Sequence, residues 1–291
     1  MKKTKLPACQ NPELYWIRNR ILSSSENDGE SILENSEKEF SIEFHSPSCE
    51  SRMPSRFPFF KPKDDFLSLA RKYACHEEPI LLLGESGAGK GHTAYYIHKN
   101  SSRRNKPFVY RNIAELNPGL FDSELFGCVK GAYTDALGSK GLIEKAGDGT
   151  LYLDEIGELT EPTQAKLLGI FEAMKYCRVG STEELPVRCR LIFATDENLL
   201  ELIQNRRFKK QLYWRLEKFV IKIPPLRERR EEIGTLAESF ARRFGKKLTE
   251  KALKVLQDFS WPGNIRALKN LVDRSAILCE KPVIDAEDLV F

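Results

Sequence analysis

The chain has 291 residues, 41% hydrophobic and 30% charged, and its 46 Lys and Arg against 42 Asp and Glu give a formal net charge of +4. A chain of this length buries about 75% of its unfolded surface on folding, so its stability requires no disulfide and no structural metal. These figures exclude collagen, disulfide miniproteins, wholly disordered chains and basic proteins that coat DNA.

Cysteine usage and hydropathy indicate a cytoplasmic protein. The seven cysteines include no CxxC pair, and none of the four histidines lies at zinc-ligand spacing from them. No segment approaches the roughly 18 apolar residues that span a bilayer, and the charged N-terminus is not followed by the apolar part of a signal peptide. We therefore predict reduced structural thiols, a cytoplasmic location and no membrane partner.

Residues 1–55 are the least informative segment. The run from Ser23 to Glu30 is polar, acidic and rich in serine, which is typical of a linker. We therefore predict a poorly defined N-terminal segment or linker, before the composition changes near Phe60.

Alternating strands and helices are predicted for residues 56–225. A helical pattern around Phe66 precedes an apolar strand, a glycine-rich turn and a helix that begins near Gly89. The strand-like segments are Ile80–Leu83, Phe108–Tyr110, Thr150–Leu153, Arg190–Ala194 and Val220–Ile223, with helical patterns between them. Elements that alternate at this length predict an α/β fold, a parallel sheet flanked by helices on both faces.

The double proline Pro224-Pro225 ends this pattern, and helical sequence follows. Three helices are predicted, over residues 230–244, 249–259 and 264–278, with Thr249 as an N-cap. We therefore predict a small all-helical subdomain over residues 226–291. The 55 N-terminal residues are too few for a receiver domain, and about a dozen residues after the last helix are too few for a helix-turn-helix, so we expect neither in this chain.

A glycine-rich motif follows the first predicted strand. Residues 84–90 read GESGAGK and fit G-x-x-x-x-G-K between a strand and a helix, the context of a phosphate-binding loop. In such a loop the backbone N–H groups and the helix N-terminus bind phosphate oxygens, and Lys90 reaches the β- and γ-phosphates. Gly91 stands where Ser or Thr usually holds Mg²⁺. A chance glycine-rich turn is the plain alternative, which the flanking elements disfavour.

A second nucleotide element lies about 65 residues downstream. The predicted strand that begins at Thr150 ends in the carboxylate pair Asp154-Glu155. After a phosphate loop, the first carboxylate would hold Mg²⁺, directly or through water, and the second would polarise the attacking water. A solvated strand end is the plain alternative for an isolated Asp-Glu pair, but its place downstream of residues 84–90 indicates ATP hydrolysis.

Six ordered segments match the motifs of one known family. The family motifs GESGTGK, ESELFG, GTLFLDEIGEL, QAKLL, PPLRER and WPGNVR correspond to residues 84–90, 122–127, 149–159, 164–168, 224–229 and 261–266. These segments resemble the AAA+ domain of bacterial enhancer-binding proteins, the NtrC-like ATPases that activate sigma-54 RNA polymerase, over about residues 56–285. The resemblance implies an AAA+ P-loop NTPase with a helical lid, ATP and Mg²⁺ as cofactors, and a self-assembled ring, expected to be a hexamer, that contacts sigma-54 RNA polymerase.

The resemblance also implies roles for individual residues. Lys90 would bind phosphate, Asp154 would bind the metal and Glu155 would be the general base. Asn112 matches the asparagine that acts as a switch for that glutamate, and Arg266 matches the lid arginine that senses the nucleotide. The expected nucleotide-binding residues are Gly84, Glu85, Ser86, Gly87, Ala88, Gly89, Lys90, Gly91, Thr195 and Arg266.

Three further positions concern hydrolysis. Arg215 matches one of two arginine fingers that the family offers to a neighbouring subunit, and Lys209 occupies the other position. Lysine keeps the charge but lacks the planar fork of arginine, and the nearby Arg207 leaves a substitute finger open. A solvated or ion-paired surface is the plain alternative for these basic side chains. Asp196 replaces a neutral asparagine beside the γ-phosphate, which would weaken or retune hydrolysis. Gly91 also departs from the family, whose lysine is usually followed by Glu, but the family lacks Ser or Thr at this position too, so Gly91 does not argue against it.

The loop that defines the family departs from its GAFTGA motif. The expected partner-binding residues are Gly131, Ala132, Tyr133, Thr134, Asp135 and Ala136. Tyr133 keeps the aromatic ring, whereas Asp135 replaces a glycine, which restricts the backbone and adds a charge. The charge at Asp135 puts the coupling to sigma-54 in question.

Two hypotheses of function result. The first is an ATP-hydrolysing AAA+ transcriptional regulator that remodels sigma-54 RNA polymerase for promoter opening, from solution or through a DNA-bound partner. The second is a divergent, weakly active paralogue that regulates a full-length activator by joining mixed rings, which Lys209, Asp196 and Asp135 favour. An AAA+ ATPase that the altered loop directs to another client is a third alternative.

Overall fold

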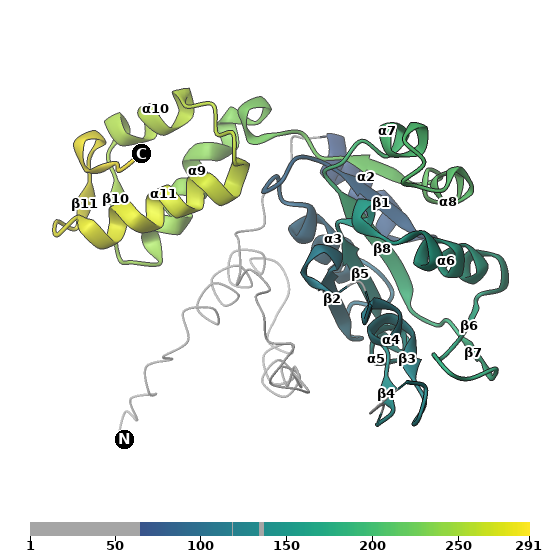
Figure 1. Cartoon of the computed structure of the whole chain (residues 1–291). Helices are drawn as coiled ribbons and strands as arrows, with labels where there is room; N and C mark the ends of the chain where they lie inside the picture. Colours follow the sequence, from purple (N-terminus) through teal and green to yellow (C-terminus); the bar gives the residue numbers. More distant parts are fainter. Residues whose placement is uncertain (1–64, 118, 134–136) are drawn as a thin grey trace, which may run out of the picture. The chain divides into compact units, whose positions relative to one another are not determined.

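The computed structural model describes residues 65–117, 119–133 and 137–291, which are coloured in Figure 1. The N-terminal segment predicted for residues 1–55 lies outside the described residues. So do Thr134, Asp135 and Ala136 of the expected partner-binding loop.

A five-stranded parallel sheet forms the centre of the α/β core. Its strands lie in the order β2 (Phe108–Asn112), β5 (Thr150–Asp154), β8 (Arg190–Thr195), β1 (Ile80–Leu83) and β9 (Val220–Lys222). Every neighbouring pair is parallel, so the carboxyl ends of the strands share one edge. The register places Asn112 opposite Asp154 and Leu83 opposite Thr195. The predicted parallel sheet is therefore confirmed.

Side chains of the central strand β5 alternate between two hydrophobic clusters. Tyr152 packs with residues of α2 (Asp65–Ala74) and α3 (Lys90–Lys99). Leu151 and Leu153 pack on the other face. That cluster includes residues of α4 (Phe121–Phe126), α5 (Leu142–Ala146), α6 (Glu161–Ala173), α7 (Leu199–Gln204) and α8 (Lys210–Leu216). The alternation is that of a strand buried on both faces, with helices covering each face as predicted (Figure 1).

Two short antiparallel pairs lie outside the main sheet. They are β3 (Gly127–Cys128) with β4 (Ser139–Lys140), and β6 (Lys175–Cys177) with β7 (Glu184–Pro186). Single 3-10 turns, η1 (Ile113–Glu115) and η2 (Ile156–Glu158), follow β2 and β5. The sequence prediction missed these strands because two or three residues carry no recognisable alternation. The β3–β4 pair matters here because it flanks residues 131–136.

The helical lid follows, as predicted. It contains η3 (Leu226–Glu228), α9 (Arg230–Arg242), α10 (Glu250–Asp258), α11 (Asn264–Leu278) and η4 (Ala286–Asp288). The predicted N-cap is confirmed, because the Thr249 side chain accepts a hydrogen bond from the Ala252 N–H. The lid has its own core around the buried Trp261, whose Nε1 donates to the Leu256 carbonyl oxygen at 2.7 Å. A parallel pair, β10 (Lys247–Leu248) with β11 (Val283–Ile284), adds strand structure that the sequence did not predict.

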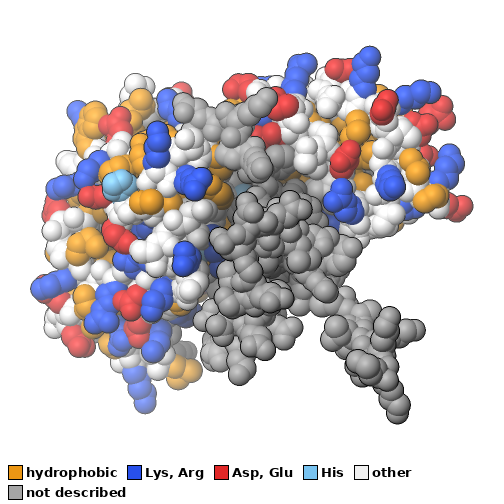
Figure 2. All heavy atoms as spheres, turned by 180° about the vertical axis from the view of Figure 1, so that it is seen from behind, with side chains coloured by type: hydrophobic (Ala, Val, Ile, Leu, Met, Phe, Trp, Pro, Cys, Tyr) orange, Lys and Arg blue, Asp and Glu red, His pale blue; other side chains and the backbone are white. Residues whose placement is uncertain are grey.

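The described cysteines are reduced, as predicted from the sequence, and the charges on the visible surface are mixed (Figure 2). The five cysteines within the described ranges are free thiols. No helix in those ranges is both long enough and apolar enough to cross a membrane. Basic and acidic side chains are interspersed where described residues are visible in Figure 2, which fits the formal net charge of +4.

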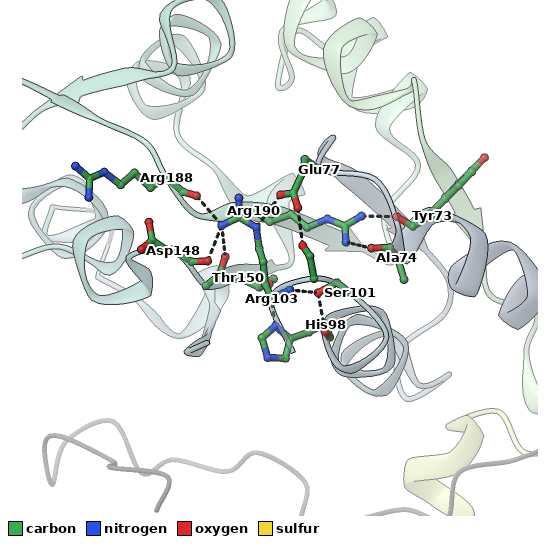
Figure 3. A network of polar contacts seen from close by, with 12 residues as sticks. Tyr73, Ala74, Glu77, His98, Ser101, Arg103, Asp148, Thr150, Arg188 and Arg190 are labelled. Atoms are coloured by element: carbon green, nitrogen blue, oxygen red, sulfur yellow. Dashed lines mark hydrogen bonds and ion pairs between the residues drawn. The ribbon is translucent and has the colours of Figure 1, made fainter. Parts of the chain in front are cut away.

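A buried polar network joins α2 to the amino end of β8 (Figure 3). Arg190, only 2% exposed, donates from Nη1 to the Ala74 carbonyl oxygen at 3.1 Å and from Nη2 to the Tyr73 carbonyl oxygen at 2.6 Å. Nearby, Arg103 Nη1 donates to the Asp148 carbonyl oxygen at 2.6 Å. Burial lowers the pKa of Arg190 to about 10, which still leaves it charged at neutral pH. The guanidinium therefore caps the end of α2 with a full charge.

We expect Arg190→Met to lower the free energy of unfolding by about 3 kcal/mol, because two helix-end carbonyls lose their donor inside the protein. Arg188→Met is the matched control, because its side chain is exposed at the same end of β8, and we expect a change within about 0.5 kcal/mol. Urea unfolding followed by circular dichroism measures both variants. Equal destabilisation by the two substitutions would contradict the capping role of Arg190.

Candidate nucleotide site

The phosphate loop connects β1 to α3 in a conformation that requires glycine. Gly87 and Gly89 have φ angles of 77° and 106°, which residues with a Cβ rarely adopt. A Cβ on Gly87 would also lie 2.5 Å from the carbonyl oxygen of Gly263 in the lid. The N-terminus of α3 has no side-chain cap, so its first N–H groups are suited to bind an anion.

Lys90 lies at the centre of the expected site. Its side chain is 6% exposed, and Nζ donates to the Gly84 carbonyl oxygen at 3.1 Å and to Glu155 Oε1 at 3.3 Å. These bonds place the ammonium between the end of β1 and the carboxylates that follow β5. The structure therefore brings the two motifs predicted from the sequence into direct contact.

Asp154 and Glu155 stand at the carboxyl end of β5. Glu155 has a φ of 58°, so the chain turns sharply there, in a conformation uncommon for a residue with a Cβ. Burial has the largest effect on both carboxyls and raises the pKa of each, while the Lys90 ammonium acts in the opposite direction. The charges of Asp154 and Asp196 raise the pKa of Glu155 further. A carboxylate with a raised pKa is a stronger proton acceptor, as a general base requires.

The end of β8 completes this edge of the sheet. Thr195 is fully buried, and its Oγ1 accepts a hydrogen bond from the Glu197 N–H at 3.1 Å. The Asp196 N–H donates to Glu155 Oε2 at 3.3 Å. This contact uses the backbone, so it does not depend on the side chain at position 196. The exposed Asp196 carboxylate adds negative charge close to Glu155.

Asn112 lies beside Asp154 across the β2–β5 ladder. Its side-chain oxygen accepts a hydrogen bond from the Ala114 N–H at 2.9 Å and caps η1. Glu155 is bonded instead to Lys90 at 3.3 Å. The strand register thus brings Asn112 next to the carboxylates, and its role as a switch stays a prediction.

The lid binds the outer side of the phosphate loop. Arg227 donates to both carboxylate oxygens of Glu85, at 2.7 and 2.9 Å, and Asn264 Nδ2 donates to the same carboxylate at 3.1 Å. The hydrogen bonds from Arg227 and then Asn264 lower the pKa of Glu85 to about 2. Arg266 Nη1 donates to Ser86 Oγ at 2.9 Å, so the predicted sensor lies on the loop.

Arg229 makes a further lid contact, in which its Nη2 donates to the Ala88 carbonyl oxygen at 2.9 Å. Arg227, Arg229 and Asn264 were not among the residues predicted to act at the site. They lie within the segments that match PPLRER and WPGNVR, so these motif matches were the sequence signal that could have identified them.

A cavity of about 470 Å³ lies between the loop, the end of β8 and the start of α11. Cavities of roughly 300–1,000 Å³ accommodate small-molecule ligands. Its lining residues are Glu85, Ser86, Asp196, Pro262, Gly263, Arg266, Ala267 and Asn270. Three of the expected nucleotide contacts line it, whereas Pro262 and Asn270 were not predicted from the sequence.

Comparison with known families agrees with this geometry. The sigma-54 interaction domain matches residues 61–222, which is more than half of the chain, and the AAA+ ATPase lid domain matches residues 227–291. The chain belongs to the sigma-54 activator family. The resemblance stated from the sequence motifs is thereby confirmed.

Individual relatives include nitrogen fixation and transcriptional regulatory proteins. The nitrogen fixation protein VnfA of Azotobacter vinelandii is 41% identical over 232 residues, 77% of this chain and 44% of that protein. The regulatory protein XylR of Pseudomonas putida is 46% identical over 209 residues, 69% of this chain and 37% of that protein. The crystal structure of NtrX from Brucella abortus in complex with ATP superposes with a TM-score of 0.71 at 35% identity, covering 77% of this chain and 52% of that one. The chain therefore spans about half the length, or less, of these relatives.

The candidate arginine fingers of this chain lie around α8. Lys209 is its N-cap, and Nζ forms an ion pair with Glu161 at 2.7 Å. Arg215 is exposed in the last turn of α8. Arg207 is also exposed, and its backbone carbonyl oxygen accepts a hydrogen bond from the Gln164 side chain. Within the described residues, none of these three basic side chains is bonded to the phosphate loop of its own chain. Arg215 is therefore accessible to another subunit, whereas Lys209 is already engaged.

The expected partner-binding loop is described only at its start. Gly131 has a φ of 80°, and a Cβ there would meet nothing within 4 Å, so its backbone conformation rather than space favours glycine. Ala132 follows, and the Tyr133 side chain is 46% exposed. Residues 134–136, with the departure at Asp135, lie outside the described ranges.

The residues at the end of β5 fit a magnesium ion bound together with a nucleotide. Mg²⁺ keeps several waters and takes one or two carboxylates plus phosphate oxygens. Asp154 offers a carboxylate at the carboxyl end of β5, where the charge of Lys90 acts on it. Among the described residues, no group of three or more His, Cys, Asp or Glu could hold a metal by itself. The donor set therefore suits a cation that phosphates and water bind in large part.

Proposed function

We propose that this chain binds ATP and Mg²⁺ between the phosphate loop and the lid, hydrolyses ATP within a ring, and remodels sigma-54 RNA polymerase for promoter opening. The observation that carries the proposal is Lys90 Nζ 3.3 Å from Glu155 Oε1, under the loop and beside Asp154. Phosphate-loop enzymes use such groups to bind phosphate, hold the metal and orient the attacking water. The ATP complex of the NtrX relative supports nucleotide binding at this site.

Each residue would have a separate task in the reaction. The loop N–H groups and Lys90 would hold the β- and γ-phosphates, and Asp154 would hold the metal, which neutralises phosphate charge. Glu155 would accept a proton from the attacking water, oriented by the Asp196 N–H at 3.3 Å from its Oε2. Arg215 of a neighbouring subunit would stabilise the charge that develops on the transferred group.

One observation favours the second candidate function, a weakly active paralogue that joins mixed rings with a full-length activator. Lys209 is held by Glu161 at 2.7 Å, so this pair must break before the lysine reaches a neighbour's phosphate. Such a chain would bind ATP through an intact loop and hydrolyse it slowly. A turnover assay on the purified chain, alone and mixed with a full-length activator, separates the two functions.

We expect Asp135→Gly to capture at least about tenfold more sigma-54 than the parent in the presence of ADP and aluminium fluoride, with little change in basal ATP turnover. A carboxylate at the contact must lose its water, and an unpaired desolvated charge costs several kcal/mol. Glu183→Gly is the control, because it removes a carboxylate from an exposed segment between β6 and β7.

Pull-down with immobilised sigma-54 measures the three proteins side by side. If sigma-54 captures the parent as well as it captures Asp135→Gly, the partner accommodates the charge. If it captures neither the parent nor Asp135→Gly, the proposed sigma-54 function itself is contradicted.

A further inference from the structure

Three consecutive carbonyl groups of the phosphate loop accept hydrogen bonds from the lid. The donors are Asn264 Nδ2, the Ile265 N–H and Arg229 Nη2, and the acceptors are the carbonyl oxygens of Ser86, Gly87 and Ala88, at 3.0, 3.0 and 2.9 Å respectively. The lid therefore holds the backbone of the loop itself, in addition to the side-chain contacts described above.

These hydrogen bonds fix the orientation of the peptide groups in the loop. A trans peptide group is planar, and its N–H points opposite to its C=O. Within the described residues no peptide bond is cis, so each carbonyl that points to the lid directs the next N–H to the other side of the loop. The Ala88 N–H closes the turn on the Glu85 carbonyl oxygen at 3.1 Å. The N–H groups of Gly87 and Gly89 are thereby oriented to bind an anion.

Asn264 is the central donor of this contact. Its side chain is 0% exposed, and Nδ2 donates both to the Ser86 carbonyl oxygen and to Glu85 Oε2, the latter at 3.1 Å. The side-chain oxygen accepts a hydrogen bond from the Leu226 N–H of η3 at 2.8 Å. The φ of 53° is a conformation that asparagine adopts more readily than most residues with a Cβ. This buried amide thus joins the loop, η3 and the start of α11.

The lid backbone lies directly against the loop at Gly87. A Cβ at this position would lie 2.5 Å from the Gly263 carbonyl oxygen and 3.1 Å from the Arg266 Cβ. A change in the position of the lid therefore acts on the loop backbone at once, because closely packed groups cannot move independently.

We propose that Asn264 is a positioning residue that holds the phosphate loop in its phosphate-binding conformation, so that the docked lid sets how strongly the site binds phosphate. The inference rests on the proposed function, because it concerns the same loop and nucleotide. Groups already held in their bound orientation bind a ligand more tightly, because less freedom is lost on binding. Coupling of binding free energies is reciprocal, so a bound phosphate should in turn hold the lid.

Asn264→Asp tests this role with little change in shape. Aspartate keeps an acceptor for the Leu226 N–H but has no donor for the Ser86 carbonyl oxygen. The probes are fluorescent mant-ADP and inorganic tripolyphosphate, which has no base or ribose and is measured by competition with mant-ADP. We expect the Kd of both probes to rise about tenfold, the effect of one hydrogen bond.

Two controls separate the hydrogen bond from the added charge. Glu85→Gln combined with Asn264→Asp exchanges the amide and the carboxylate between the two positions, so the formal charge equals that of the parent while the Ser86 carbonyl still lacks its donor. We expect this double variant to bind both probes about tenfold more weakly than the parent and than Glu85→Gln alone. Gln257→Glu adds a carboxylate to α10 of the lid and is expected to bind both probes as the parent does.

Hydrogen exchange of the parent gives a test that needs no variant. Residues 226–229 contact the loop through Arg227 and Arg229. Tripolyphosphate bound to the loop should therefore slow the exchange of backbone amides in these residues, although it has no base or ribose to contact the lid. Mass spectrometry of the peptide that covers residues 226–229 measures the change.

Each outcome bears on the inference. An unchanged Kd of either probe in Asn264→Asp, or an equal loss in Gln257→Glu, would overturn the role of Asn264. A double variant that binds as Glu85→Gln does would overturn it as well, because charge alone would then explain the loss. Unchanged exchange of residues 226–229 would contradict the reciprocal coupling and the inference with it. All these results leave the proposed function intact, whereas a parent that binds neither probe would overturn that function itself.

Discussion

Glu155→Gln is expected to bind ATP as the parent does and to hydrolyse it about 100- to 10,000-fold more slowly, the usual contribution of a general base. Glutamine keeps an acceptor oxygen for Lys90 Nζ, which lies 3.3 Å from Glu155 Oε1 in the parent. Glutamine cannot accept a proton from water at neutral pH, so this variant should bind ATP without hydrolysing it at the parent rate. Phosphate release measures turnover, and the Kd of mant-ATP measures binding.

Two further variants make the result specific. Glu158→Gln changes an exposed carboxylate three residues along the chain, in η2, and is expected to leave turnover unchanged. Lys90→Ala is expected to lose nucleotide binding itself, because the loop then lacks its cation. Turnover of Glu155→Gln at the parent rate would show that another group is the base.

Arg215→Ala is expected to keep ATP binding and to lose turnover by about 1,000-fold or more, the effect typical of an arginine finger. The side chain is exposed at the end of α8 and, among the described residues, makes no bond to the phosphate loop of its own chain, so we expect it to act across a subunit interface. For the same reason, parent turnover per subunit should rise with protein concentration until rings are complete.

Mixing two inactive variants tests the interface directly. An Arg215→Ala subunit has an intact loop, and a Lys90→Ala neighbour has an intact finger, so about one interface in four regains both groups in a random equal mixture. Lys210→Ala, an exposed basic residue in the first turn of α8, is the control. Absence of any restored turnover in the mixture would contradict a shared site.

The sequence by itself determined the α/β core, the position of the phosphate loop and the carboxylate pair. The run Ile80 to Leu83, the glycines that follow and the strand that ends at Asp154 are local patterns, each contained in a few residues. Local patterns are readable because strand burial, turn conformation and helix capping depend on neighbours in the chain. The same locality explains why the N-cap at Thr249 was predicted and then found.

Tertiary structure alone decided how the lid holds the loop and which side chains are free to act. Glu85 is bound by Arg227 and Asn264, which lie 142 and 179 residues further along the chain, and Lys209 is engaged by Glu161, 48 residues before it. The Tyr152 ring lies beside Gly91 only because β5 and the start of α3 pack together. Contacts of this range depend on how the elements assemble, and neither hydrophobic periodicity nor a motif records which side chain a distant residue will meet.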